Sequence, residues 1–193
     1  MKTNLRQITG NWNAGFVLDK HTIQSELAGH NQWGQPEWNT TRSEAGEALF
    51  QLKYRADFSQ AVPLAEELAS SIYPKFHEVG RIIPMPASSP RNRQPVTAIA
   101  EALGRIVDRP VFDELLTKVA NGQQLKDLHT KEEKQAALAG TFTVHEGITT
   151  DGCWNALLID DLFDTGATVE AACAALRGYH KISKIYVAAI TWK

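Results

Sequence analysis

The chain has 193 residues, a formal net charge of −2 and 43% hydrophobic residues, a composition typical of one soluble globular domain. This near-neutral charge argues against non-specific nucleic-acid binding by the whole surface, although a local basic patch is compatible with it. We find no signal peptide and no apolar stretch of about 20 residues, so we expect a cytoplasmic protein without membrane contact. The cysteines and histidines show no metal-ligand spacing, and therefore no zinc site is expected.

Residues 1–42 differ from the rest because they are rich in Asn, Gly, Thr and His and contain three of the five tryptophans. A short apolar run at 15–18 predicts a strand within this region. We expect residues 1–42 to form a small hood that packs on a core domain of residues 43–193 through aromatic side chains. Stacking on a planar base is the alternative role of these aromatic residues, which are Trp12, Phe16, Trp33 and Trp38.

From residue 43 onward, strand and helix patterns alternate. Helices are predicted at 43–54, 61–76, 90–107 and 168–179, and strands at 81–85, 110–112, 141–144, 154–159 and 185–190. This order predicts an α/β fold with a central, mostly parallel five-stranded sheet flanked by helices. Ligands of such sheets bind at the carboxyl ends of the strands, so we expect the site there.

The segment LLIDDLFDTGAT, residues 157–168, has the features of a phosphate site. It consists of a buried strand, a short loop and the start of a helix. Gly166 lets the backbone approach a ligand, the first-turn amides and the helix dipole favour an anion, and Thr165 and Thr168 add hydroxyl donors.

Two carboxylates, Asp160 and Asp161, stand directly upstream of this cradle. A phosphate would repel them, so we expect them to accept hydrogen bonds from sugar hydroxyls or to hold a divalent cation. Together with the cradle, they predict a site for a sugar phosphate with magnesium. Receiver domains also have a double aspartate after a strand, but near the N-terminus and without a T-G-x-T helix start.

The segment 157–168 resembles the phosphoribosyl-pyrophosphate motif of type I phosphoribosyltransferases without a break. The resemblance implies that Asp160 and Asp161 contact the ribose hydroxyls, directly or through Mg²⁺, and serve catalysis with Asp164. It also implies that the 5′-phosphate is held by Asp164, Thr165, Gly166, Ala167 and Thr168. Asp164 occupies the position that acts on the base in purine-salvage members.

The segment IIPMPASS, residues 82–89, resembles the pyrophosphate loop of the same family. The residues assigned to this loop are Ala87, Ser88, Ser89, Arg91 and Arg93. The small residues leave backbone amides free and the two arginines would neutralise pyrophosphate. The alternative is that both arginines are solvated.

Most of residues 43–193 resembles the ComF-like branch of the superfamily. Members of this branch have an L-K-Y helix, and residues 47–54 are similar to it. Many members carry an N-terminal zinc module whose four cysteines this chain lacks, and Arg93-Gln94-Pro95 replaces the usual R-G-x-N-Q. The resemblance also implies a flexible loop at 117–139 that closes over the site. Its candidate lysines are Lys118, Lys126, Lys131 and Lys134.

Three functions are compatible with these residues. The first is transfer of a phosphoribosyl group from phosphoribosyl pyrophosphate, with Mg²⁺, to a nucleobase or similar nitrogen nucleophile. The second is a non-catalytic regulator or DNA-processing factor, with single-stranded DNA as a partner. The third, a module that has lost its ligand, leaves the intact motif unexplained. A homodimer is a further expectation from the resemblance.

Overall fold

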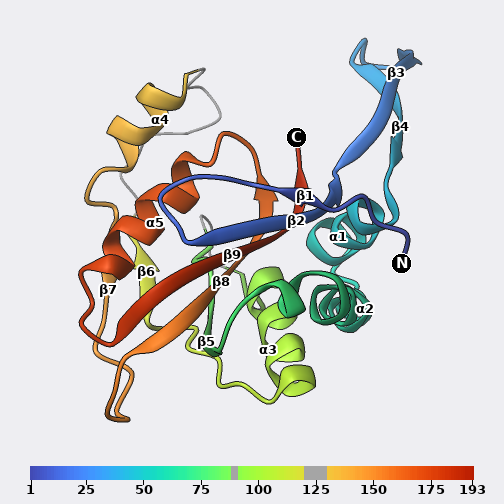
Figure 1. The fold of residues 1–193 in the computed structure, drawn as a ribbon. Coiled ribbons are helices and arrows are strands. Elements are labelled where there is room, and N and C mark those ends of the chain that lie inside the picture. Colours follow the sequence, from blue (N-terminus) through green and yellow to red (C-terminus); the bar gives the residue numbers. More distant parts are fainter. Residues whose placement is uncertain (88–90, 120–129) are drawn as a thin grey trace.

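The computed structural model describes residues 1–87, 91–119 and 130–193 and has a five-stranded central sheet (Figure 1). Its strands, in spatial order, are β1 (Arg6–Gln7), β2 (Ala14–Lys20), β9 (Ile182–Trp192), β8 (Trp154–Phe163) and β5 (Val79–Pro84). Neighbouring strands run parallel except β1, which is antiparallel to β2. The predicted α/β fold with a mostly parallel five-stranded sheet is thus confirmed.

Apolar side chains of the central strands alternate between the two faces of the sheet. On β8, Leu157 and Ile159 belong to one buried cluster, whereas Ala156 and Leu158 belong to the other. A parallel strand reads as a continuous apolar run because both of its faces are covered. The apolar run before Asp160 is therefore the signature of a central strand.

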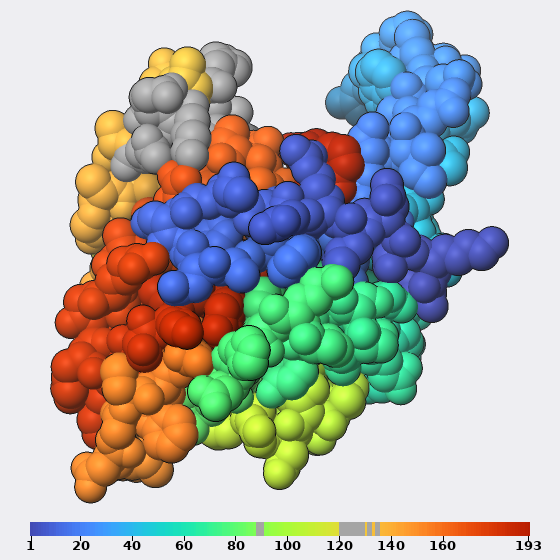
Figure 2. All heavy atoms as spheres, viewed as in Figure 1, coloured from blue at the N-terminus to red at the C-terminus, as the bar shows by residue number. Residues whose placement is uncertain are grey.

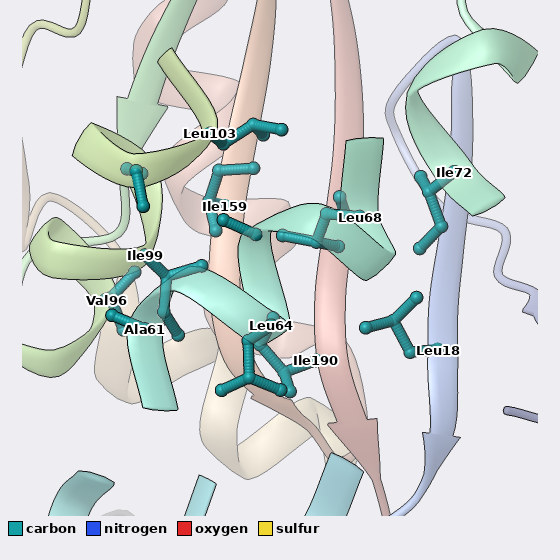
Figure 3. Packing of buried hydrophobic residues seen from close by; sticks show 14 of the residues in the cluster. Leu18, Ala61, Leu64, Leu68, Ile72, Val96, Ile99, Leu103, Ile159 and Ile190 are labelled. Atoms are coloured by element: carbon teal, nitrogen blue, oxygen red, sulfur yellow. The ribbon is translucent and has the colours of Figure 1, made fainter. Parts of the chain in front are cut away.

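Helices cover both faces. The first face is covered by α1 (Glu44–Tyr54), η1 (Phe58–Gln60), α2 (Ala61–Glu67), its continuations η2 (Leu68–Ile72) and η3 (Tyr73–Lys75), and α3 (Pro95–Val107). On this face Leu64, Leu68 and Ile99 pack towards Ile159 and Ile190 of the sheet (Figure 3). The second face is covered by α5 (Ala167–Arg177).

Several predicted boundaries shift for local reasons. The helix predicted at 90–107 begins at Pro95, which occupies the first helical turn, where a missing N–H costs nothing. The strand predicted at 154–159 continues to Phe163, so both aspartates stand on the strand and not in a loop. The strand predicted at 110–112 was wrong in extent, because it is an isolated bridge between Ile82 and Val111.

The N-terminal region contributes to two structures. β1 and β2 belong to the central sheet, whereas β3 (Thr22–His30) and β4 (Pro36–Arg42) form an antiparallel hairpin that projects from the body of the molecule (Figures 1 and 2). Trp12 is buried, but Trp33 and Trp38 of the hairpin are 75% and 57% exposed. The expected packing of the tryptophans against the core is therefore wrong for these two.

A smaller ladder flanks the second face. β6 (Leu116–Lys118) pairs with β7 (Phe142–Val144), and α4 (Lys131–Leu138) precedes β7. Thr130 and Glu133 form a capping box that starts α4. Among the described residues, no helix has the length and apolar character needed to cross a membrane.

Candidate functional site

The candidate site is a cleft where β5 and β8 end. The Met85 amide donates to the Ile159 carbonyl at 2.8 Å, which holds the segment after β5 against the end of β8. The cleft has a volume of about 200 Å³. It is lined by Lys53, Met85, Pro86, Ala87, Arg91, Gln94, Pro95, Val96, Asp160, Asp161 and Thr168. Five residues expected at the site from two sequence segments therefore line one cleft: Ala87, Arg91, Asp160, Asp161 and Thr168.

Lys53 is a member of this cleft that sequence reasoning did not assign to the site. It stands in the last turn of α1, and its Nζ lies 2.9 Å from Asp161 Oδ2. Both side chains are only 20% exposed, so the ion pair is shielded from much of the solvent. The L-K-Y pattern of α1 was a signal for Lys53, but sequence reasoning used it only for the family resemblance.

The surroundings of Asp160 raise the pKa of its carboxyl group. Burial raises its pKa to about 7, and the Asp161 carboxylate adds to the rise, while the Asp161 amide, Lys53 and Lys118 act in the opposite direction. The hydrogen bond from the Asp161 amide to Asp160 Oδ1 is 2.8 Å long. Asp160 therefore holds its proton more readily than an ordinary aspartate, chiefly because it is buried and also because a second carboxylate lies beside it.

The turn after β8 leads directly into α5 through Gly166. Gly166 has φ of 83° and immediately precedes α5. A Cβ at this position would lie 3.0 Å from Phe163 Cζ, so glycine suits the turn both by conformation and by space. The first helical hydrogen bond runs from the Glu170 amide to the Gly166 carbonyl, and the amides before it form the positive end of the helix.

The remaining predicted residues lie as follows. Asp164 is exposed and Thr165 is half-buried, with Thr165 Oγ1 3.5 Å from the Ala167 amide that donates to it. Arg91 donates to the Lys53 carbonyl at 2.7 Å, whereas the Arg93 guanidinium lies 4.6 Å from the centre of the Phe58 ring, away from the cleft lining.

The lysines expected on the flexible loop are only partly described. Lys118 is half-buried on β6, and burial lowers its pKa, while Asp160 counteracts that effect. Ser88, Ser89 and Lys126 lie outside the described residues, as do the side chains of Lys131 and Lys134. Among the loop lysines whose side chains are described, Lys118 interacts electrostatically with Asp160.

The donor set suits magnesium better than a transition metal. No cluster of three or more His, Cys, Asp or Glu side chains with the arrangement of a metal site occurs in the described part of the chain. Mg²⁺ characteristically uses one or two carboxylates together with substrate oxygens and water. The adjacent carboxylates of Asp160 and Asp161 fit that requirement by their donor type.

Comparison of the sequence with known proteins found a protein of similar sequence. No family profile matches the chain. Over 133 residues the chain is 29% identical to the competence protein ComFC of Bacillus subtilis. This alignment covers 67% of this chain and 52% of ComFC. The chain thus spans about half the length of this curated relative.

Solved structures with similar architecture include two phosphoribosyltransferases. The hypoxanthine phosphoribosyltransferase of Staphylococcus aureus has a TM-score of 0.43 at 12% identity, over 70% of this chain and 65% of that one. The adenine phosphoribosyltransferase of Saccharomyces cerevisiae has a TM-score of 0.42 at 10% identity, over 86% and 83%. The match to ComFC bears out the expected resemblance to ComF-like proteins, and the observed sheet has the expected mostly parallel α/β architecture.

Proposed function

We propose that this chain binds phosphoribosyl pyrophosphate (PRPP) with Mg²⁺ and transfers the phosphoribosyl group to a nitrogen nucleophile. The observation that carries the proposal is the sequence of features at the end of β8. Two carboxylates, Asp160 and Asp161, are followed within one turn by the left-handed Gly166 and the amino end of α5. Hydroxyl acceptors and an anion cradle therefore stand side by side, as a sugar 5′-phosphate requires.

The charged residues in and near the cleft each have a chemical task in this reaction. Asp160 and Asp161 accept hydrogen bonds from the ribose hydroxyls and fix the sugar, with Lys53 holding the Asp161 carboxylate in place. The α5 amides hold the 5′-phosphate, while Arg91 lies on the side of the cleft assigned to the pyrophosphate. Lys118 supplies a cation near Asp160 as charge develops on the leaving group.

The carboxylates of Asp160 and Asp161 would hold Mg²⁺, which, when bound, neutralises charge on the departing pyrophosphate. During transfer, the bond from the ribose C1 to pyrophosphate breaks and a bond from C1 to the nitrogen nucleophile forms. Asp164 is exposed beside the cradle and serves as the candidate group that takes the proton from the incoming nitrogen.

Release of pyrophosphate in the presence of PRPP, Mg²⁺ and a panel of nucleobases tests the proposal. We expect release that depends on one class of acceptor and is lost in Asp160→Asn. Asp151→Asn, an exposed aspartate of a distant loop, is the matched control and should keep full release. PRPP binding without release on any acceptor would overturn the transferase function and favour a PRPP-dependent regulator.

A role in DNA processing is the second candidate, because the relative ComFC is described as a competence protein. Binding of this kind would rest on phosphate contacts and weaken steeply with salt. A gel-shift titration of single-stranded DNA at low and moderate salt tests it. Retardation that is lost at moderate salt and competed by PRPP would link the DNA to the same cleft, and absence of retardation at low salt excludes the role.

A further inference from the structure

A second and larger cavity lies at the amino-terminal edge of the central sheet, opposite the candidate cleft. Its volume is about 690 Å³, within the range of small-molecule pockets. The first residues of β5, β8 and β9 line it. Trp154 of this cavity and Asp160 of the cleft stand six positions apart on β8, which separates the two places by roughly 20 Å.

Arg81 lines this cavity, and its charge has no counter-ion in the described part of the chain. Arg81 is only 7% exposed, and within the described residues no carboxylate lies at ion-pair distance from it. Its Nη1 and Nη2 donate to neutral acceptors, the Gly80 carbonyl at 2.8 Å and Thr150 Oγ1 at 2.7 Å. A buried cation without an anion is costly, and the adjacent aromatic rings offset only part of that cost.

Two further N–H groups point to a missing acceptor. Arg81 Nε and Trp154 Nε1 are buried and have no hydrogen-bond partner among the described residues. The guanidinium carbon lies 3.8 Å from the centre of the Trp154 ring, so the two groups belong to one stack. Buried N–H donors in native proteins nearly always have a hydrogen-bond acceptor. Two unpaired donors at a cation without a counter-ion therefore indicate that an oxyanion binds here.

Two register shifts in the central sheet lie beside the stacked Arg81 and Trp154 side chains. The β5–β8 pairing shifts register between Val79 and Arg81, and the β8–β9 pairing shifts between Trp154 and Ala156. Gly80 lies in the first of these shifts, where a Cβ would come within 2.9 Å of Trp154 Cε3. A side chain at Gly80 would therefore displace the indole ring from its place over Arg81.

We propose that this basal cavity binds a small ligand through a phosphate or carboxylate group that pairs with Arg81. The rim carries the exposed cations Arg109 and Lys184 and the exposed carboxylates Glu78 and Asp108. The anionic group of the ligand points inward to Arg81, and the mixed rim suits a polar remainder. Both unpaired N–H groups are shielded from water, so entry of the ligand requires the indole of Trp154 to shift.

Side-chain N–H resonances of the tryptophans separate this cavity from the PRPP cleft. The Trp154 signal, assigned through Trp154→Phe, reports on the basal cavity. The Trp12 signal reports on the 5′-phosphate cradle, since Trp12 Cη2 lies 3.8 Å from where a Gly166 Cβ would stand. Inorganic phosphate and benzoate are the two probes, and chloride at equal ionic strength is the control. A saturable shift at Trp154 with either probe supports the proposal, and the responding probe names the anionic group.

Two variants sharpen the result. Arg81→Met, which keeps bulk but removes charge, should abolish the Trp154 shift and leave the Trp12 response to phosphate unchanged. Lys184→Glu alters only an exposed rim residue and should raise the midpoint concentration at least about threefold, whereas Lys2→Glu should not. Lys184→Glu keeps the test decisive if Arg81→Met fails to fold.

The proposal is overturned if Trp154 responds to neither probe beyond the chloride control, or if its midpoint is the same in Lys184→Glu and wild type. It does not rest on PRPP chemistry. A chain that fails to bind PRPP could still show the Trp154 response, and the reverse also holds.

Discussion

Asp160→Asn should stabilise the ligand-free protein while it weakens PRPP binding. Asp160 is partly buried, with the Asp161 carboxylate next to it and a hydrogen bond from the Asp161 amide. These surroundings raise its pKa from 3.8 to about 7. An amide at this position keeps the acceptor for that hydrogen bond and carries no charge.

The magnitude follows from the shift. This rise in the pKa of Asp160 corresponds to roughly 4 kcal/mol of unfolding free energy. Partial contact of Asp160 with water reduces the expected effect to about 1–3 kcal/mol. Because the folded-state pKa lies above the unfolded value, the folded state holds the proton longer. Wild-type stability should therefore fall as pH rises from about 4 to about 7 and stay low above that range.

Urea denaturation with EDTA present, followed by circular dichroism, measures the effect. At about pH 8, we expect the free energy of unfolding of Asp160→Asn to exceed that of wild type by about 1–3 kcal/mol, and at about pH 4 the two should agree. Asp151→Asn should match wild type at both values. Equal stability of Asp160→Asn and wild type at the higher pH, or an equal gain at both, would refute the electrostatic reasoning.

Three further changes probe the parts that build the site. Lys53→Met should lower the free energy of unfolding by about 1–2 kcal/mol, since it leaves the shielded Asp161 carboxylate unpaired, and Lys53→Arg should recover part of the loss in the same urea titration. Gly166→Ala should lower the free energy of unfolding by about 1–2 kcal/mol, because residue 166 has a positive φ and a Cβ there would contact Phe163. The measurements are a lower melting temperature and weaker binding of PRPP. Ser43→Ala should cost about 1 kcal/mol, because Ser43 Oγ both caps α1 and donates to the Lys20 carbonyl; an unchanged midpoint of thermal unfolding would contradict this.

The order of elements and the site edge could be predicted because their signals are local. The continuous apolar run before Asp160 requires a strand covered on both faces, and the T-G-x-T turn requires a helix start. Parallel strands bring their carboxyl ends to one edge, so the convergence of Ala87, Asp160 and Thr168 on one cleft followed from topology.

Features that depend on tertiary neighbours could not be predicted. Nothing in the pattern of α1 says that Lys53 pairs with Asp161, which is more than 100 positions away in the chain. The exposure of Trp33 and Trp38 depends on a hairpin that extends away from the sheet, and composition alone suggested that they would be buried. Strand β2 also lies in the central sheet although it precedes the expected core domain, because it pairs with β9, the last strand.

Calorimetric titration of PRPP into the protein, with and without Mg²⁺, tests the central claim most directly. We expect saturable binding that requires Mg²⁺, is weakened at least about tenfold by Asp160→Asn or Gly166→Ala, and is unchanged by Asp151→Asn. Heats no larger than those of dilution, or equal affinity in wild type and Asp160→Asn, would contradict the assignment of the end of β8 as the PRPP site.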